Sequence, residues 1–214
     1  MPRVRRKPWT KDELLKYEDD LVIVSPEKYK GRWKEVFKKD KIHIELGTGK
    51  GQFVTTLAEQ NKDIGYIGAD RVKEVLYETL RKTLSKELDN MKVLWFDVNK
   101  IDEAFDEDEL DRIYINFCDP WPKRRHRKRR LTHRGFLEKY RKILVKNGEI
   151  HLKTDSEILF EFTLNEMLQF GFKLEDISLN LYRDGDPGTI KTEYEEKFIE
   201  EGKPIYRLRA INVK

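Results

Sequence analysis

Short apolar runs alternate with amphipathic stretches through the first two thirds of the chain, and this alternation constrains the fold most strongly. Five runs that are rich in β-branched and aromatic residues are predicted strands, at residues 42–46, 66–69, 93–96, 113–117 and 150–152. Between them, apolar residues recur at the spacing of one helical face. Repeated strand–helix–strand units predict an α/β fold with an open, parallel sheet.

The remaining elements follow from turn signals. A stripe of apolar residues at 136–144 predicts a helix that ends at Asn147-Gly148. A second helix is expected at 156–170, because Gly171 follows it, and residues 192–201 fit a third. Strands are expected at 172–181 and 205–211. A parallel sheet that is completed by a late hairpin fits this order, and we predict a single domain over residues 1–214.

Several classes of protein are excluded by composition and spacing. The single cysteine, Cys118, rules out a disulfide framework and a cysteine-based zinc site. The four histidines show no metal-binding spacing, and no apolar stretch approaches the ~20 residues of a membrane span. The basic start is not followed by the apolar segment of a signal peptide. We therefore expect a cytoplasmic protein with no metal site and no contact with a membrane.

The net charge of +4 says little by itself, but the charges are strongly segregated. An N-terminal arm at about residues 1–25 begins with five cations and no acid within its first 11 residues, and residues 123–130 hold seven cations in eight positions. Clustered Lys and Arg of this density predict phosphate contacts with a nucleic acid. A solvated loop or a nuclear-localisation tract is the alternative. The acidic block at 102–111 is interpreted as a solvated helix and loop.

A glycine-rich turn, Gly47-Thr48-Gly49-Lys50-Gly51, joins the first of the five strands to a helix. Glycines allow positive φ and a close approach of a ligand, and a helix start offers free N–H groups. The third glycine comes one residue too early for a dinucleotide fingerprint, and no phosphate-binding P-loop motif is present. Glu45 would repel a pyrophosphate at this position, whereas it suits a positively charged ligand.

Three more carboxylates follow the ends of predicted strands. Asp70 could accept hydrogen bonds from a ribose diol, and Asp97 could bind an adenine amino group. With Glu45 and the glycines, these spacings resemble a class I S-adenosylmethionine site, although simple strand-end caps are the alternative. Asp119 begins a stiff Asp-Pro-Trp-Pro loop at the crevice of the sheet. Trp121 could stack on a base or pack in the core.

Four segments resemble the bacterial tRNA (guanine-N7-)-methyltransferase family: residues 45–51 (ELGTGKG), 116–123 (NFCDPWPK), 151–155 (HLKTD) and 192–195 (TEYE). The opening RKPW at 6–9 is similar as well, so the resemblance covers the chain in order. It implies a Rossmann-like class I fold, with a mostly parallel seven-stranded sheet, helices on both faces and an antiparallel C-terminal hairpin. It also implies methyl transfer from S-adenosyl-L-methionine to N7 of guanosine 46 in the variable loop of tRNA.

The resemblance assigns roles by position, with Asp119 as the catalytic residue. Asp70 stands where the family often has a glutamate, which is one methylene longer. The residues expected to bind the cofactor are Glu45, Gly47, Gly49, Gly51, Asp70, Asp97 and Asp119. Those expected to bind the guanosine or its tRNA are Lys123, Asp155, Thr192, Glu193, Tyr194 and Glu195. Those expected to contact RNA are Arg124, Arg125, Arg127, Lys128, Arg129 and Arg130.

Three other functions fit the sequence less well. A small-molecule methyltransferase would share the cofactor site but would not need seven adjacent cations. A non-catalytic RNA-binding protein with a nucleotide-type fold is the second alternative. An NAD-dependent oxidoreductase is disfavoured by Glu45 and by the glycine spacing. We expect tRNA as the partner and no obligatory protein partner, with monomer and homodimer both open.

Overall fold

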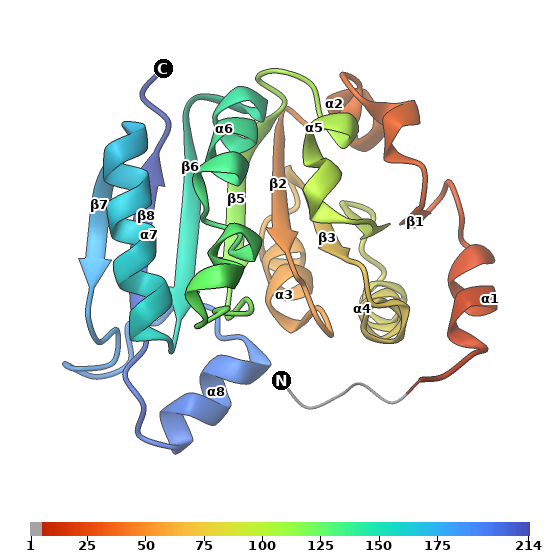
Figure 1. Ribbon diagram of the computed structural model, residues 1–214. Coiled ribbons are helices and arrows are strands. Elements are labelled where there is room, and N and C mark those ends of the chain that lie inside the picture. Colours follow the sequence, from red (N-terminus) through yellow and green to blue (C-terminus); the bar gives the residue numbers. More distant parts are fainter. Residues whose placement is uncertain (1–5) are drawn as a thin grey trace.

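In the computed structural model, residues 6–214 are described, and they form one mixed sheet flanked by helices (Figure 1). Within these residues the sheet has eight strands in the order β1-β4-β3-β2-β5-β6-β8-β7. Their bounds are β1 (Val22–Ile23), β2 (Lys41–Leu46), β3 (Ile64–Asp70), β4 (Met91–Trp95), β5 (Leu110–Asn116), β6 (Leu144–Thr154), β7 (Lys173–Ser178) and β8 (Tyr206–Ile211). The predicted α/β class is confirmed.

The first six strands are mutually parallel, and β8 runs antiparallel between β6 and β7. This confirms the parallel sheet with an antiparallel C-terminal end. The strand that was not predicted is β1, which has two residues and pairs with Val93 and Leu94 at the edge of the sheet. So short a segment carries no alternating pattern that the sequence could show.

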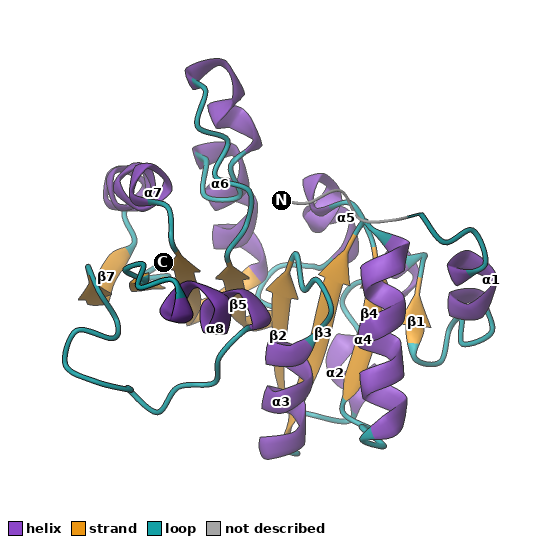
Figure 2. Ribbon diagram, turned by 90° about the horizontal axis from the view of Figure 1, so that it is seen from below, coloured by secondary structure: helices purple, strands orange, loops and turns teal. Residues whose placement is uncertain are grey.

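Helices cover both faces of the sheet (Figure 2). On one face, α3 (Gln52–Gln60) and α4 (Lys73–Ser85) lie over β2, β3 and β4, and α1 (Thr10–Leu15) packs against α4. On the other face lie α5 (Ile101–Ala104), α6 (Arg134–Ile143) and α7 (Glu157–Phe170). The remaining short elements are η1 (Pro26–Tyr29), α2 (Trp33–Phe37), η2 (Val98–Lys100), η3 (Arg124–Arg129) and α8 (Glu193–Glu200).

Alternate side chains of the central strands enter two different cores. Ile44, Ile113 and Leu152 are buried with the apolar stripe of α6, whereas Tyr66 and Tyr114 are buried under Phe53 and its neighbours in α3. Each large apolar side chain stabilises the fold by about 1.5–3 kcal/mol when it is fully buried. The two cores fix the sheet, and therefore the positions at which its strands end.

The predicted end of the helix at Asn147-Gly148 is wrong. Helix α6 ends at Ile143, and Leu144 already pairs with Leu110 of β5. Pairing resumes only at Glu149, opposite Arg112, so the intervening residues form a bulge in β6, and Asn147 takes a φ of 61° there. The Asn-Gly signal for a left-handed residue was right, but it belongs to a bulge.

The acidic block is also more than a solvated surface. Glu109 is buried, and its carboxylate accepts hydrogen bonds from the backbone N–H groups of Trp33 at 2.8 Å, Gly31 at 3.0 Å and Asp106 at 2.8 Å. Asp111 accepts one from the N–H of Ile42 at 2.9 Å. These two acids therefore tie the segment around α2 to the sheet.

Candidate active site

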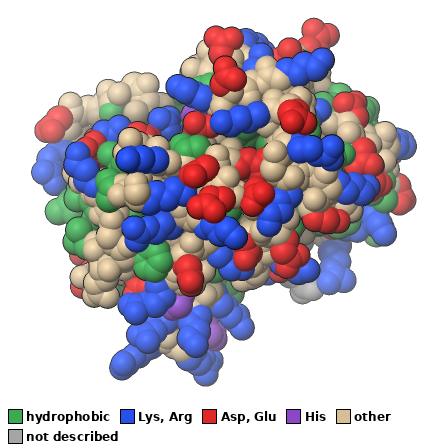
Figure 3. Space-filling view, turned by 90° about the horizontal axis from the view of Figure 1, so that it is seen from above, with side chains coloured by type: hydrophobic (Ala, Val, Ile, Leu, Met, Phe, Trp, Pro, Cys, Tyr) green, Lys and Arg blue, Asp and Glu red, His purple; other side chains and the backbone are tan. Residues whose placement is uncertain are grey.

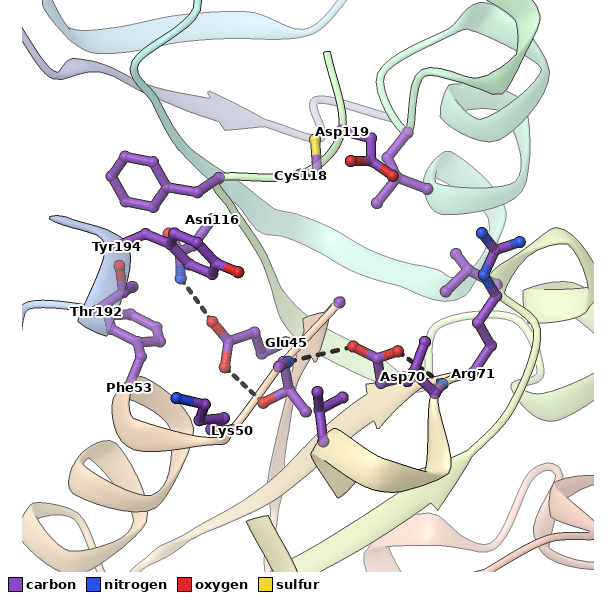
Figure 4. A pocket seen from close by; sticks show the side chains of 18 of the residues that line it. Glu45, Lys50, Phe53, Asp70, Arg71, Asn116, Cys118, Asp119, Thr192 and Tyr194 are labelled. Carbon is purple, nitrogen blue, oxygen red and sulfur yellow. Dashed lines mark hydrogen bonds between the residues drawn. The ribbon is translucent and has the colours of Figure 1, made fainter. Parts of the chain in front are cut away.

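A cavity of about 720 Å³ opens at the carboxyl ends of β2, β3 and β5 (Figure 4). Nine of the residues predicted to bind the cofactor or the guanosine line it: Glu45, Gly47, Gly49, Asp70, Asp97, Asp119, Thr192, Glu193 and Tyr194. They come from strand ends, from the glycine-rich turn and from the start of α8. The crevice beyond the carboxyl ends of parallel strands is where such sheets bind ligands.

The glycine-rich turn is folded back against the end of β3. Gly47 and Gly49 have φ values of 78° and 56°, and a side chain at either position would meet no atom within 4 Å. The N–H groups of Gly47 and Thr48 donate to the carbonyl oxygen of Ala69, at 2.8 and 3.0 Å. The turn therefore presents bare backbone to open space, as a closely bound ligand requires.

Gly51, predicted to bind the cofactor, does not line the cavity. Its φ is 77°, and an added Cβ would lie 2.5 Å from the methyl group of Thr79 in α4. The hydroxyl of Thr79 donates to the carbonyl of Gly49 at 3.0 Å. Gly51 thus lets the start of α3 approach α4 closely, and it shapes the turn from behind.

Glu45 lies at the floor of the cavity and is only 3% exposed. Its carboxylate accepts hydrogen bonds from the Thr48 hydroxyl at 2.8 Å and from the Asn116 amide at 2.9 Å (Figure 4). Burial raises its pKa to about 7, against the lowering effect of these two bonds. A positive charge bound nearby would favour the ionised form. Asn116 was not singled out as a site residue, although it ends the same predicted strand that leads to Asp119.

Two further carboxylates stand on the neighbouring strands. Asp70 accepts from the N–H of Gly49 at 3.2 Å and from that of Val72 at 2.9 Å, and burial raises its pKa. Asp97 begins η2 and accepts from the N–H of Asn99 at 3.0 Å. Both line the cavity, so the three acids that the sequence placed at strand ends do meet in one site.

Asp119 approaches the cavity from the far side, opposite Glu45 and Asp70 (Figure 4). Its loop is held between two non-glycine residues in the left-handed region, Phe117 with a φ of 48° and Trp121 with a φ of 42°. Such conformations are costly and persist only where the surroundings impose them, typically at functional sites. The loop is therefore a stiff support for an exposed carboxylate.

Helix α8 closes one side of the cavity with its first residues. Thr192 and Glu195 form a capping box, and Glu193 pairs with Lys82 of α4 at 2.9 Å. Glu195, predicted to bind substrate, does not line the cavity and is fully buried. Its carboxylate binds the Lys153 ammonium at 2.9 and 3.0 Å. This ion pair fixes the helix that carries the cavity-lining residues.

Comparisons with known proteins agree with this geometry. A family model, Methyltransf_4, described as "Putative methyltransferase", matches residues 39–208. The tRNA (guanine-N(7)-)-methyltransferase of Geobacillus sp. (strain WCH70) is 48% identical, over 96% of this chain and 93% of the relative. That of Bacillus subtilis (strain 168) is 47% identical, over 96% of both chains. This chain belongs to the tRNA (guanine-N7-)-methyltransferase family.

Solved structures with lower identity share the fold of this family member. A 16S rRNA (adenine(1408)-N(1))-methyltransferase from Catenulisporales acidiphilia aligns with a TM-score of 0.64 at 16% identity, over 92% of this chain and 98% of that one. An "antibiotic related Methyltransferase" aligns with a TM-score of 0.60 at 21% identity, over 83% and 90% of the two chains. These likenesses support the Rossmann-like methyltransferase architecture.

The basic run of this methyltransferase reaches the cavity at its C-terminal end. Six of its cations, residues 123–125 and 127–129, are exposed, and Lys128 and Arg129 also line the cavity. Figure 3 shows Lys and Arg side chains gathered on one protruding part of the surface. Arg130 differs, since it is 5% exposed and its guanidinium donates to backbone carbonyls of the protein. A contact between Arg130 and RNA is therefore not supported.

Two other predicted residues lie outside the cavity. Lys123 is exposed just before η3, and Asp155 is half-buried just after β6. In the N-terminal arm, Arg3 and Arg5 fall outside the described residues, while Lys7 pairs with Glu78 of α4 at 3.6 Å. Between residues 6 and 214 no helix is long and apolar enough to cross a membrane, and no group of three or more candidate ligands could hold a metal.

Proposed function

We propose that this protein transfers a methyl group from S-adenosylmethionine to N7 of guanosine 46 in the variable loop of tRNA. The observation that carries the proposal is the meeting of an acid-lined cavity with a run of six exposed cations, two of which, Lys128 and Arg129, line the cavity. Family membership supports the methyl donor and the class of reaction, and the named relatives support tRNA as the substrate. The same proposal places the protein in the cytoplasm, as a monomer or homodimer.

The cavity fits the donor on observations of its own. Open space beside Gly47 and Gly49 admits a ligand against bare backbone, and the buried carboxyl of Glu45 is a suitable partner for a positive charge. Asp70 would accept from the ribose hydroxyls, and Asp97 would accept from the adenine amino group. When bound, the donor supplies a methyl group on a positively charged sulfur.

The residues of this chain have to position the base rather than remove a proton. N7 of guanine carries a lone pair and no hydrogen, so no strong general base is needed, and alignment dominates the rate. Guanine becomes positively charged as its new bond forms. The exposed carboxylate of Asp119, at the rim of the cavity, is placed to stabilise that charge. Its stiff loop keeps the carboxylate in place while the base enters.

Methylation of tRNA transcripts with a labelled donor tests the substrate. We expect labelling of a transcript that has guanosine at position 46, and none of a transcript with adenosine there. Mapping the modified nucleotide then identifies the base directly. Equal labelling of both transcripts would refute position 46, and donor binding by calorimetry without any methylation would favour the non-catalytic alternative.

The basic run makes a separate, electrostatic prediction. Arg125→Ala with Arg127→Ala should weaken tRNA binding and make the slope of log K against log salt shallower by roughly 0.7–0.9 for each lost phosphate contact. The matched control is Lys34→Ala with Lys38→Ala, since these exposed cations belong to α2 and its cap at the opposite end of the sheet (Figure 1). Equal slopes for the two double variants would contradict a role for the basic run in holding RNA.

A further inference from the structure

Arg130, the last cation of the basic run, is turned into the protein. Its Nε donates to the carbonyl oxygen of Pro120 at 3.0 Å, and its Nη2 donates to that of Trp121 at 3.1 Å. Its guanidinium carbon lies 4.4 Å from the ring centre of Phe162 in α7. The Arg130 side chain is buried. A phosphate could not take the place of the two carbonyl oxygens unless the loop moved.

The two carbonyls belong to the loop that carries Asp119. They belong to the two residues that directly follow Asp119, and Trp121 is itself in the left-handed region, as is Phe117 before Asp119. Proline at 120 removes one backbone donor and fixes its own φ, so this loop has few hydrogen bonds with which to hold itself. An outside group must hold a strained backbone, and the guanidinium contacts it at two consecutive peptide groups.

The segment that carries Arg130 is itself attached to helix α7. The hydroxyls of Thr132 and Thr163 share a buried hydrogen bond of 2.7 Å, which pins the segment just after Arg130 to α7. The ring of Phe162, which lies against the guanidinium, belongs to the same helix. A planar fork of N–H donors is needed to bind both carbonyls at once, and arginine provides one whereas lysine does not.

We propose that Arg130 is a positioning residue for methyl transfer: it joins the Asp119 loop to α7 and so holds the Asp119 carboxylate at the cavity. This inference rests on the proposed function and deepens it. It also separates one arginine from a run of otherwise exposed cations. Arg130 acts on turnover through the loop, whereas its exposed neighbours act on RNA binding.

The experiment compares Arg130→Lys, Arg130→Ala and Arg127→Ala, the last at an exposed cation of η3, which ends just before Arg130. For both Arg130 variants we expect kcat to fall roughly 10- to 100-fold, as misplacement of a reacting group by about 1 Å would cause. The KM for tRNA and the salt slope of tRNA binding should stay close to wild type. Arg127→Ala should instead raise the KM for tRNA and make the slope shallower by roughly 0.7–0.9.

Circular dichroism and the melting temperature show whether each variant is folded, and Arg130→Lys decides the question if the alanine variant is not. A wild-type kcat for a folded Arg130→Lys would overturn the proposal, because a phosphate contact needs only the charge. A shallower salt slope for Arg130→Ala would overturn it as well. A wild-type protein that cannot methylate tRNA would refute the proposed function and this role together, whereas an active wild type with an unimpaired Arg130→Lys would refute this role alone.

Discussion

Replacement of Glu45 by glutamine tests the electrostatics of the cavity quantitatively. The carboxyl is 3% exposed, and burial raises its pKa from 4.5 to about 7. A difference of about 2.5 pKa units corresponds to about 3 kcal/mol between the folded and unfolded states. Because the pKa of this carboxyl is higher in the folded protein, it makes the fold less stable as the pH rises. Between about pH 4.5 and pH 7 the unfolded chain ionises it while the fold keeps it protonated.

The variant removes this loss while keeping the local hydrogen bonds. A glutamine can accept from the Asn116 amide and donate to the Thr48 hydroxyl, so it imitates the protonated acid. Urea unfolding of both proteins without the donor, at pH 5 and pH 8, gives the free energies. We expect the stability of the variant relative to wild type to increase by about 2–3 kcal/mol between these pH values. Other titrating groups cancel in this comparison.

A constant difference between the two proteins, within about 1 kcal/mol, would refute the reasoning, because Glu45 would then ionise as it does in water. The same reasoning fixes the response to the donor. A positive charge near Glu45 favours the ionised carboxylate, so donor binding near pH 6 should release a proton. Calorimetry in buffers of different ionisation enthalpy detects that proton, and Glu45→Gln should abolish its release.

Three other replacements test separate parts of the site. Asp119→Asn should lower kcat by roughly 10²-fold with an unchanged melting temperature, because the side chain is exposed; a wild-type kcat in the labelled-donor assay would exclude a catalytic role. Gly51→Ala should lose about 2–4 kcal/mol of unfolding free energy, more than Gly49→Ala, because only the first Cβ meets a neighbour; equal losses in urea would contradict this steric account. Lys153→Met should lower the unfolding free energy by about 3–5 kcal/mol, because it leaves Glu195 buried without its cation. Adding Glu195→Gln to this variant should recover part of the lost melting temperature. No recovery would mean that loss of the ion pair is not the cause.

The sequence predicts the framework of this protein well for a physical reason. Parallel strands buried on both faces read as apolar runs, and the residues just after them must gather at one edge of the sheet. Glu45, Asp70 and Asp97 could therefore be placed together without a structure. The spacing of these acids carried the prediction, and no tertiary contact was needed.

The features that the sequence does not show depend on partners that are distant in sequence. Arg130 stands in the same run of basic residues as its exposed neighbours. It differs from them only in its contacts with Phe162 and with the backbone carbonyls of the Asp119 loop. Glu195 belongs to a motif that suggests a binding residue, yet its partner is Lys153, 42 positions earlier. Local patterns report periodicity and turn chemistry, whereas the burial of a single charge is decided by packing.

The separation of charges across the site limits how a nucleic acid can approach it. Carboxylates of Glu45, Asp70 and Asp119 line the cavity, while the six exposed cations belong to the basic run, of which Lys128 and Arg129 reach the cavity. A phosphodiester is attracted to the exposed cations of the basic run, whereas the carboxylates of the cavity do not repel an uncharged base. We therefore expect the RNA backbone to stay on the basic run while a single base leaves its stack and reaches inward. The cost of unstacking favours a nucleotide that is already exposed, so this expected mode of approach restricts which base can be methylated.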